Sequence, residues 1–247
     1  MSVASASSVL LGSETPRLWT PELRPLTPAT SRGFEVIEFA EGVLGVKLHP
    51  WQRWLLVHLL ELTPAGHFRF RAALVLVARQ NGKTLLMQVL ALWRMYLDNA
   101  PLILGTAQNL DVSEEAWEGA VELAESIPDL AAEMDRPVRV NGKKAMRLKT
   151  GERYKVAAAS RKGGRGLSAD MVMLDELREH QNWEAWGAVT KTTMARPNAQ
   201  VYAFSNAGDD KSIVLNALRE NAIAALKDPA NADPSLGIFE WSAPDEI

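Results

Sequence analysis

The stretch LVLVARQNGKT at residues 74–84 decides the fold of this chain. It overlaps an apolar run, residues 72–78, whose length and β-branched composition predict a buried strand. A short polar loop follows and ends in Gly82, Lys83 and Thr84, after which residues 85–97 have the composition of a buried helix. Strand, loop and helix in this order are typical of a phosphate-binding loop.

Each residue type in this loop suits a bound triphosphate. Gly82 lets the backbone approach phosphate oxygens, and the N–H groups of the first helical turn attract the anion. Lys83 would reach the β- and γ-phosphates, and the Thr84 hydroxyl would ligate Mg²⁺. The standard pattern has its first glycine where this chain has Val77, so an Asn-Gly turn followed by a lysine is the alternative. We predict ATP contacts along the loop at Arg79, Gln80, Asn81, Gly82, Lys83 and Thr84.

Length and composition indicate one large domain. The chain has 247 residues, 47% of them hydrophobic, which is ample for a core. It has no cysteine, so an intracellular protein without disulfides is expected. All apolar runs are shorter than the ~18 residues of a membrane span, so we expect no membrane partner. Residues 1–33, rich in Ser, Thr and Pro, are predicted to be a poorly ordered arm before the domain at 34–247.

Basic residues are concentrated in one segment. Residues 136–165 hold eleven Lys or Arg and one acid, although the chain has a net charge of −3. Basic and apolar residues alternate there, and Asn-Gly and Thr-Gly pairs separate the runs, which predicts an antiparallel meander with a cationic face. That face is either only solvated or contacts DNA phosphates or another subunit. The candidate contacts are Arg139, Lys143, Lys144, Arg147, Lys149, Arg153, Lys155, Arg161 and Lys162.

Helices and strands alternate around the phosphate loop. An amphipathic helix is predicted over residues 33–46, and a second helix begins at Pro50. Gln52, on its opening turn, either reads an adenine edge or is only a solvated side chain. After a further strand, a helix starts with Asp111 and Glu114 spaced as in a capping box. The alternation predicts an α/β domain whose mostly parallel central sheet is flanked by helices.

An acid pair follows another apolar strand. Residues 171–174 lead into Asp175 and Glu176, at the carboxyl end where ligands bind in open parallel sheets. Asp175 can hold Mg²⁺, and Glu176 can orient and deprotonate the attacking water. The alternative is that the two acids only favour the first turn of a helix.

Two further segments flank the acid pair. The GGRG stretch upstream carries Arg165, which is either brought by a mobile loop to a γ-phosphate in this subunit or an adjacent one, or is part of an ordinary basic loop. Downstream, a strand at residues 199–204 ends in Ser205 and Asn206. These two polar residues would lie beside the phosphate site and report its occupancy to the next helix.

Four motifs together resemble the ATPase domain of the large terminase subunit of tailed bacteriophages, of the HK97-like type. They are LHPWQRWLL, VARQNGKT, GGRGLSADMVMLDE and FSNAGDD, in that order, over about residues 34–240. The resemblance implies an ASCE-type P-loop NTPase fold, which is RecA-like. It also implies a motor that uses ATP to package double-stranded viral DNA into a preformed capsid.

The resemblance assigns the nucleotide site residue by residue. Gln52 matches the adenine-reading position. Asp175 matches the metal-binding acid and Glu176 the catalytic glutamate. The family's phosphate loop commonly lacks the first glycine and carries an arginine, and its positions match Arg79, Gly82, Lys83 and Thr84.

The resemblance also implies movement and assembly. Ser205 and Asn206 match the motif that couples hydrolysis to movement. Arg165 resembles in placement an arginine that enters a neighbour's site in a ring of subunits, and Arg79 competes for this role. The implied partners are double-stranded DNA, further copies of the chain, the portal protein and the small terminase subunit, at the procapsid in the host cytoplasm. Family members usually continue into an RNase H-like nuclease domain, which this chain does not reach, so we expect no nuclease activity.

Two other functions fit parts of the pattern. A superfamily 2 helicase also combines a glutamine motif, a phosphate loop and an Asp-Glu pair, but it needs a second RecA-like domain for which this length has no room. A nucleotide-binding assembly module that does not hydrolyse is the other candidate. Glu176 argues against it, because loss of that acid is the usual origin of such modules.

Overall fold

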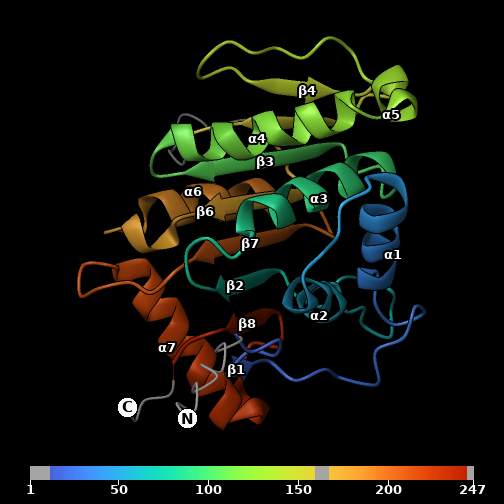
Figure 1. Cartoon of the computed structure of the whole chain (residues 1–247). Coiled ribbons are helices and arrows are strands. Elements are labelled where there is room, and N and C mark those ends of the chain that lie inside the picture. Colours follow the sequence, from blue (N-terminus) through green and yellow to red (C-terminus); the bar gives the residue numbers. More distant parts are fainter. Residues whose placement is uncertain (1–11, 159–166, 244–247) are drawn as a thin grey trace, which may run out of the picture.

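A central sheet organises the fold (Figure 1). The computed structural model describes residues 12–158 and 167–243, and within them eight strands form one sheet in the order β1-β8-β2-β7-β6-β3-β5-β4. The two outermost strands, β1 and β4, pair antiparallel with their neighbours, and the inner pairs are all parallel. The predicted mostly parallel sheet and its antiparallel edge are therefore confirmed. The strands are Leu18–Trp19 (β1), Ala72–Leu76 (β2), Leu102–Ala107 (β3), Ala145–Arg147 (β4), Arg153–Val156 (β5), Met171–Asp175 (β6), Gln200–Ser205 (β7) and Leu236–Glu240 (β8).

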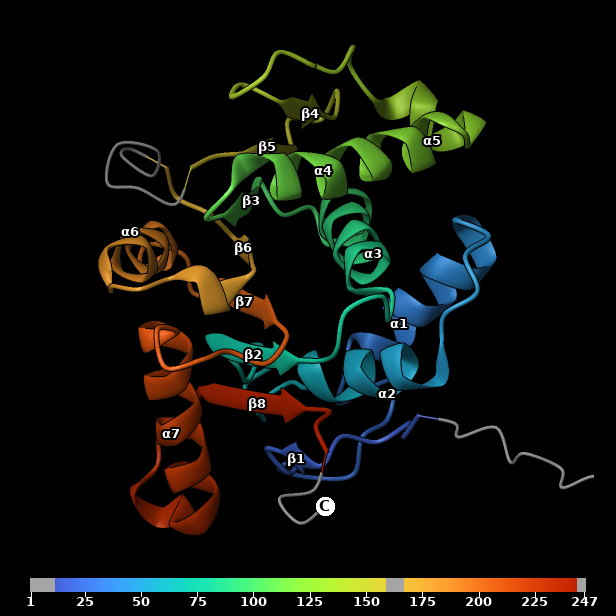
Figure 2. The same cartoon turned by 60° about the vertical axis from the view of Figure 1, so that its left-hand side comes forward.

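Helices cover both faces of the sheet (Figure 2). Ala73 and Val75 of β2 belong to the core under α1 to α4, whereas Leu74 and Leu76 belong to the core under α6 and α7. Strands buried on both faces read as continuous apolar runs, which is why residues 72–78 could be recognised. None of the described helices is long and apolar enough to cross a bilayer. The helices are Gly33–Glu38 (α1), Pro50–Leu59 (α2), Lys83–Tyr96 (α3), Leu110–Glu125 (α4), Pro128–Glu133 (α5), Glu184–Thr193 (α6) and Ile213–Lys227 (α7), with short turns at Phe39–Val43 (η1, a π-helix), Leu177–Glu179 (η2) and Pro229–Asn231 (η3).

The segment before α1, predicted to be a poorly ordered arm, contributes one strand to the sheet. Residues 1–11 lie outside the described part of the chain. Leu18 and Trp19 form β1 and pair with Glu240 and Phe239 of β8, at the far end of the chain. Arg17 adds an ion pair to Glu240 at 3.1 Å. Residues 17–19 are therefore an edge of the sheet, fixed by contacts that composition alone does not reveal.

The start of α4 differs from the predicted capping box. Asn109 is the N-cap, and its Oδ1 accepts a hydrogen bond from the Asp111 N–H at 3.1 Å. Glu114 turns away from the helix start, because its carboxylate accepts the Gly142 N–H at 2.9 Å and pairs with Lys144. The capping-box assignment is wrong since these longer-range partners compete for the same carboxylate.

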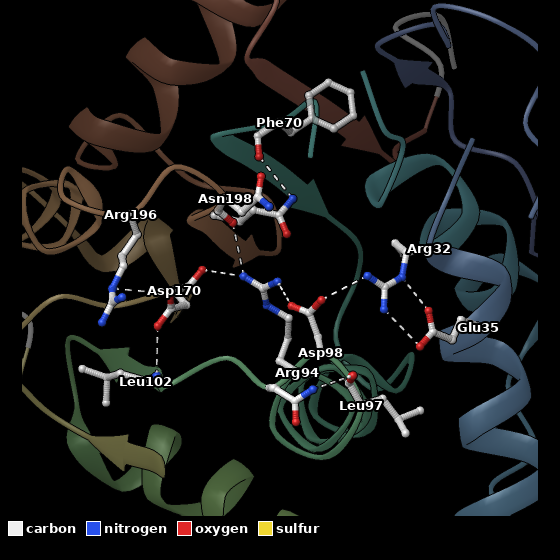
Figure 3. A network of polar contacts seen from close by, with 12 residues as sticks. Arg32, Glu35, Phe70, Arg94, Leu97, Asp98, Leu102, Asp170, Arg196 and Asn198 are labelled. Atoms are coloured by element: carbon white, nitrogen blue, oxygen red, sulfur yellow. Dashed lines mark hydrogen bonds and ion pairs between the residues drawn. The ribbon is translucent and has the colours of Figure 1, made fainter. Parts of the chain in front are cut away.

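A buried arginine network ties the end of α3 to the opposite edge of the sheet from the loop (Figure 3). Arg94 is 2% exposed and forms an ion pair with Asp98. Its guanidinium also donates to the Asp170 carbonyl at 2.7 Å and the Asn198 carbonyl at 3.3 Å, just before β6 and β7. Asp98 pairs in turn with Arg32 beside α1 at 3.1 Å. The last turn of α3 is thus held to two strands and to a second helix.

Candidate active site

The phosphate loop connects the carboxyl end of β2 to α3. Gly82 is the N-cap of α3 and has a positive φ of 82°, a conformation that glycine adopts without strain. A Cβ at this position would lie 2.9 Å from Nε2 of Gln52. Gly82 is thus required both by the backbone conformation and by close packing. Gln80 also has a positive φ, 61°, which bends the loop before the helix starts.

Lys83 folds back over the loop. Its Nζ donates to the carbonyls of Val77 at 3.0 Å and Ala78 at 3.2 Å. Burial lowers the pKa of Lys83, and the nearby carboxylates of Asp175 and Glu176 oppose that effect by raising it. The loop lysine follows the carboxyl end of β2 and the acid pair stands at that of β6, and these two strand ends lie at the same edge of the sheet with only β7 between them.

The acid pair stands at the end of β6. Only β7 separates β6 from the loop strand β2, so all three carboxyl ends meet at one edge of the sheet. Asp175 is buried, and its Oδ1 accepts the Glu176 N–H at 2.8 Å. Burial is the main reason that the pKa of Asp175 is raised, and the Lys83 ammonium counteracts it. Glu176 has a positive φ of 54°, which costs a non-glycine residue on the order of 1 kcal/mol and is typical of functional positions.

The residues at this edge fit a magnesium ion. Thr84 lies in the first turn of α3 and is partly buried. Oδ1 of Asp175 accepts a hydrogen bond from a backbone N–H, and the second carboxylate oxygen is available as a metal ligand. Mg²⁺ usually takes one or two protein ligands and completes its shell with water and phosphate oxygens.

Ser205 joins the two halves of the site. Its backbone carbonyl accepts the Val77 N–H at 3.0 Å, where the phosphate loop begins. Its Oγ accepts the Arg178 N–H at 3.2 Å, in the turn that follows the acid pair. Ser205 is 1% exposed, so both hydrogen bonds are shielded from water. The adjacent Asn206 is partly exposed at the same edge.

Gln52 is placed next to the loop but is fully buried. Its Nε2 donates to the Gly82 carbonyl at 2.9 Å, and its Oε1 accepts the His49 N–H at 2.8 Å. The side-chain amide therefore ties the start of α2 to the phosphate loop. Of the two alternatives that the sequence left open, the solvated side chain is wrong because Gln52 is buried, and the adenine contact stays a prediction.

Of the arginines predicted to stabilise the charge on the γ-phosphate, Arg79 lies in the described part of the chain and Arg165 does not. Arg79 lies on the exposed part of the loop, and its positive charge contributes to lowering the pKa of Lys83. Arg161, Lys162 and Arg165 lie outside the described residues.

The basic segment divides into paired and unpaired cations. Arg139 contacts Glu118 and Glu125 of α4, and Lys144 contacts Glu114 and Glu118. These two bases pair with three acidic residues of α4. Lys149 donates to the Ala132 carbonyl at 2.8 Å, and Lys143 is exposed.

Arg147 and Arg153 form an uncompensated cation pair. They lie directly opposite each other in the β4–β5 ladder, and both are exposed. No hydrogen bond or ion pair joins either guanidinium to another residue in the described ranges. Like charges directly opposite on paired strands are destabilising by a few tenths of a kcal/mol. Lys155 lies on the same face of β5, so the open cationic surface consists of Arg147, Arg153 and Lys155.

One residue of the site was missed by sequence reasoning. Arg178 follows the acid pair in η2, and its charge also contributes to lowering the pKa of Lys83. A usable signal was present, because residues directly after a strand that ends in catalytic acids lie at the same edge of the sheet.

A parallel sheet with a phosphate loop on one strand, an acid pair on another and one strand between them defines an ASCE-type P-loop NTPase fold. The chain matches no protein-family model and no curated protein sequence. Among solved structures it is similar to the HK97 bacteriophage large terminase, with a TM-score of 0.72 and 23% identity over 88% of this chain and 45% of that one. It has the fold of the ATPase domain of phage large terminases.

Two more structures support this fold. The ATPase domain of the Thermus phage P74-26 large terminase gives a TM-score of 0.59 at 16% identity, over 81% of this chain and 83% of that one. The large terminase of another thermophilic bacteriophage gives 0.51 at 8% identity, over 87% of this chain and 46% of that one. The chain spans less than half the length of the HK97 protein and of this last terminase.

Proposed function

We propose that this chain is the ATP-hydrolysing motor domain of a DNA-packaging terminase. One observation carries the proposal: Lys83 of the phosphate loop and the Asp175–Glu176 pair lie at one sheet edge, and Ser205 is hydrogen-bonded to both sides. A fold shared with large terminase ATPase domains supports the same function. Nothing observed favours a helicase or a non-hydrolysing assembly module.

The side chains divide the reaction between them. The loop and first-turn N–H groups bind the phosphates of ATP, and Lys83 exchanges the Val77 and Ala78 carbonyls for phosphate oxygens. Glu176 orients a water molecule and takes its proton as the water oxygen attacks the γ-phosphorus. The bond from that phosphorus to the bridging oxygen breaks, and ADP leaves. Thr84 and Asp175 would hold Mg²⁺, which supplies positive charge for the phosphate oxygens.

The remaining predicted roles belong to this proposal. Gln52 holds the loop to α2 through both ends of its amide, and its second N–H and second oxygen lone pair are what remain for adenine. An arginine supplies additional positive charge to the transition state, from Arg79 in the same chain or from Arg165 across a ring of copies. Ser205 and Asn206 couple hydrolysis to movement. The proposed setting is the procapsid in the host cytoplasm, with the portal protein and the small terminase subunit as further partners.

A loop variant tests nucleotide binding directly. Lys83→Ala removes charge-assisted hydrogen bonds worth about 1.5–3 kcal/mol, so ATP affinity should fall by roughly tenfold or more. Isothermal titration with ATP and Mg²⁺ measures the change. Lys227→Ala, which truncates an exposed lysine in the last turn of α7, is the matched control and should bind normally. Equal affinities for the two variants would contradict the phosphate-loop assignment.

The open cationic surface is the proposed DNA contact. Arg147→Gln with Arg153→Gln removes two cations that lack an acidic partner in the described chain. If both contact phosphates, the slope of log affinity against log salt for duplex DNA should decrease by about 2. Arg139→Gln is the control, because Arg139 is already paired with Glu118 and Glu125. If the double variant has the same slope as the Arg139→Gln control, this surface does not contact DNA. If the double variant changes only self-association, the surface contacts a neighbouring copy instead.

A further inference from the structure

The turn after the acid pair connects the active site to α7. Within it, the Glu179 N–H donates to the Glu176 carbonyl at 2.9 Å, which closes the turn on the catalytic glutamate. The Arg178 N–H is held by Ser205 Oγ. The His180 carbonyl accepts the Val214 N–H from the first turn of α7 at 3.4 Å. The position of Arg178 is therefore set by the catalytic strand, by β7 and by the next helix.

The Arg178 guanidinium has few hydrogen-bond partners in its present position. Its side chain is 25% exposed, and its ion pair is with the adjacent Glu179, at 2.8 Å, whose side chain is 45% exposed. The Nε atom is buried and has no hydrogen-bond acceptor among the described residues. An unpaired buried donor on a charged group is costly, so a guanidinium placed in this way favours an anionic acceptor.

The surroundings of Arg178 leave room for such an acceptor. Arg178 lines a hollow of about 220 Å³ between the turn and the start of α7, together with Gly208, Asp209 and Lys211. The Asp209 carboxylate is held within its own loop, where its Oδ1 accepts from the Lys211 N–H at 2.8 Å and lies 3.4 Å from Ser212 Oγ. The positive charge of Arg178 also contributes to lowering the pKa of Lys83. Arg178 thus lines this hollow, while its backbone is held through Ser205 at the point where the phosphate loop begins.

We propose that Arg178 contacts the terminal phosphate of bound ATP from within the same chain, exchanging its ion pair with Glu179 for γ-phosphate oxygens. The inference rests on the proposed function and adds a residue to it. Because the Arg178 backbone is hydrogen-bonded to Ser205, the contact also makes the position of the turn depend on whether a γ-phosphate is present. Arg79 and Arg165 are then free to act elsewhere in the site or in a neighbouring copy.

The decisive measurement is the ratio of ATP to ADP affinity. Isothermal titration with each nucleotide and Mg²⁺ would use a Glu176→Gln parent, in which ATP survives the experiment. Adding Arg178→Gln should weaken ATP binding by roughly tenfold or more and change ADP binding by less than about threefold. A merely structural role would weaken both nucleotides equally.

Two further variants keep the test independent of folding defects. Glu179→Gln weakens the competing ion pair without touching the arginine, so ATP binding should be equal to or tighter than that of the parent. Lys227→Gln removes an exposed lysine in the last turn of α7, away from the hollow, and should leave the ATP to ADP ratio unchanged. If the parent prefers ATP and the Arg178→Gln variant keeps that preference, the inference is wrong although the proposed function stands. If the parent binds neither nucleotide, the proposed function fails and the inference fails with it.

Discussion

Glu176→Gln is expected to bind ATP normally and to hydrolyse it at least ~100-fold more slowly, the usual scale for loss of a general base. The amide keeps the size of the side chain and the turn but cannot accept the proton of the attacking water. Phosphate release under saturating ATP measures turnover, and isothermal titration measures binding. Glu220→Gln, an exposed change of the same kind on α7, should turn over like the parent. Turnover by the Glu176→Gln variant within a few-fold of the parent would reassign the catalytic base.

Arg94→Met is expected to lower the free energy of unfolding by about 3 kcal/mol, the scale for breaking a buried ion pair. Methionine fills much of the same space but cannot donate, so the Asp170 and Asn198 carbonyls lose their guanidinium partner and Asp98 keeps only Arg32. Urea denaturation measures the loss. Arg53→Met removes an exposed ion pair to Glu41 and should shift the midpoint little. A parent-like midpoint for Arg94→Met would mean that the network of Figure 3 contributes little to stability.

The sequence was most informative where a local pattern is sufficient. Doubly buried strands gave unbroken apolar runs, so β2 and β6 could be placed before the structure was known. Because parallel strands align their carboxyl ends, the loop and the acid pair could also be expected at the same edge. The predicted helix over residues 33–46 is helical from Gly33 to Val43, although its second half is a π-helix.

Features set by distant partners could not be read in this way. β1 is only two residues long and exists because β8 pairs with it across more than two hundred residues. Glu114 fitted a local capping box, yet Gly142 and Lys144 take its carboxylate. Gln52 looked like a free recognition side chain, and its burial became apparent only once α2 was packed against the loop. Helix α6 was not predicted at all.

Helix α3 has a mechanical consequence. It begins at the phosphate loop and ends in the Arg94 network, and its fourteen residues correspond to about 21 Å of rigid length. Hydrogen bonds hold both ends, so the helix rigidly connects the phosphate loop at one edge of the sheet to the Arg94 network at the opposite edge. A displacement of its loop end would therefore reach Arg94 at the other end of the helix and, through Asp98, the Arg32 side chain beside α1.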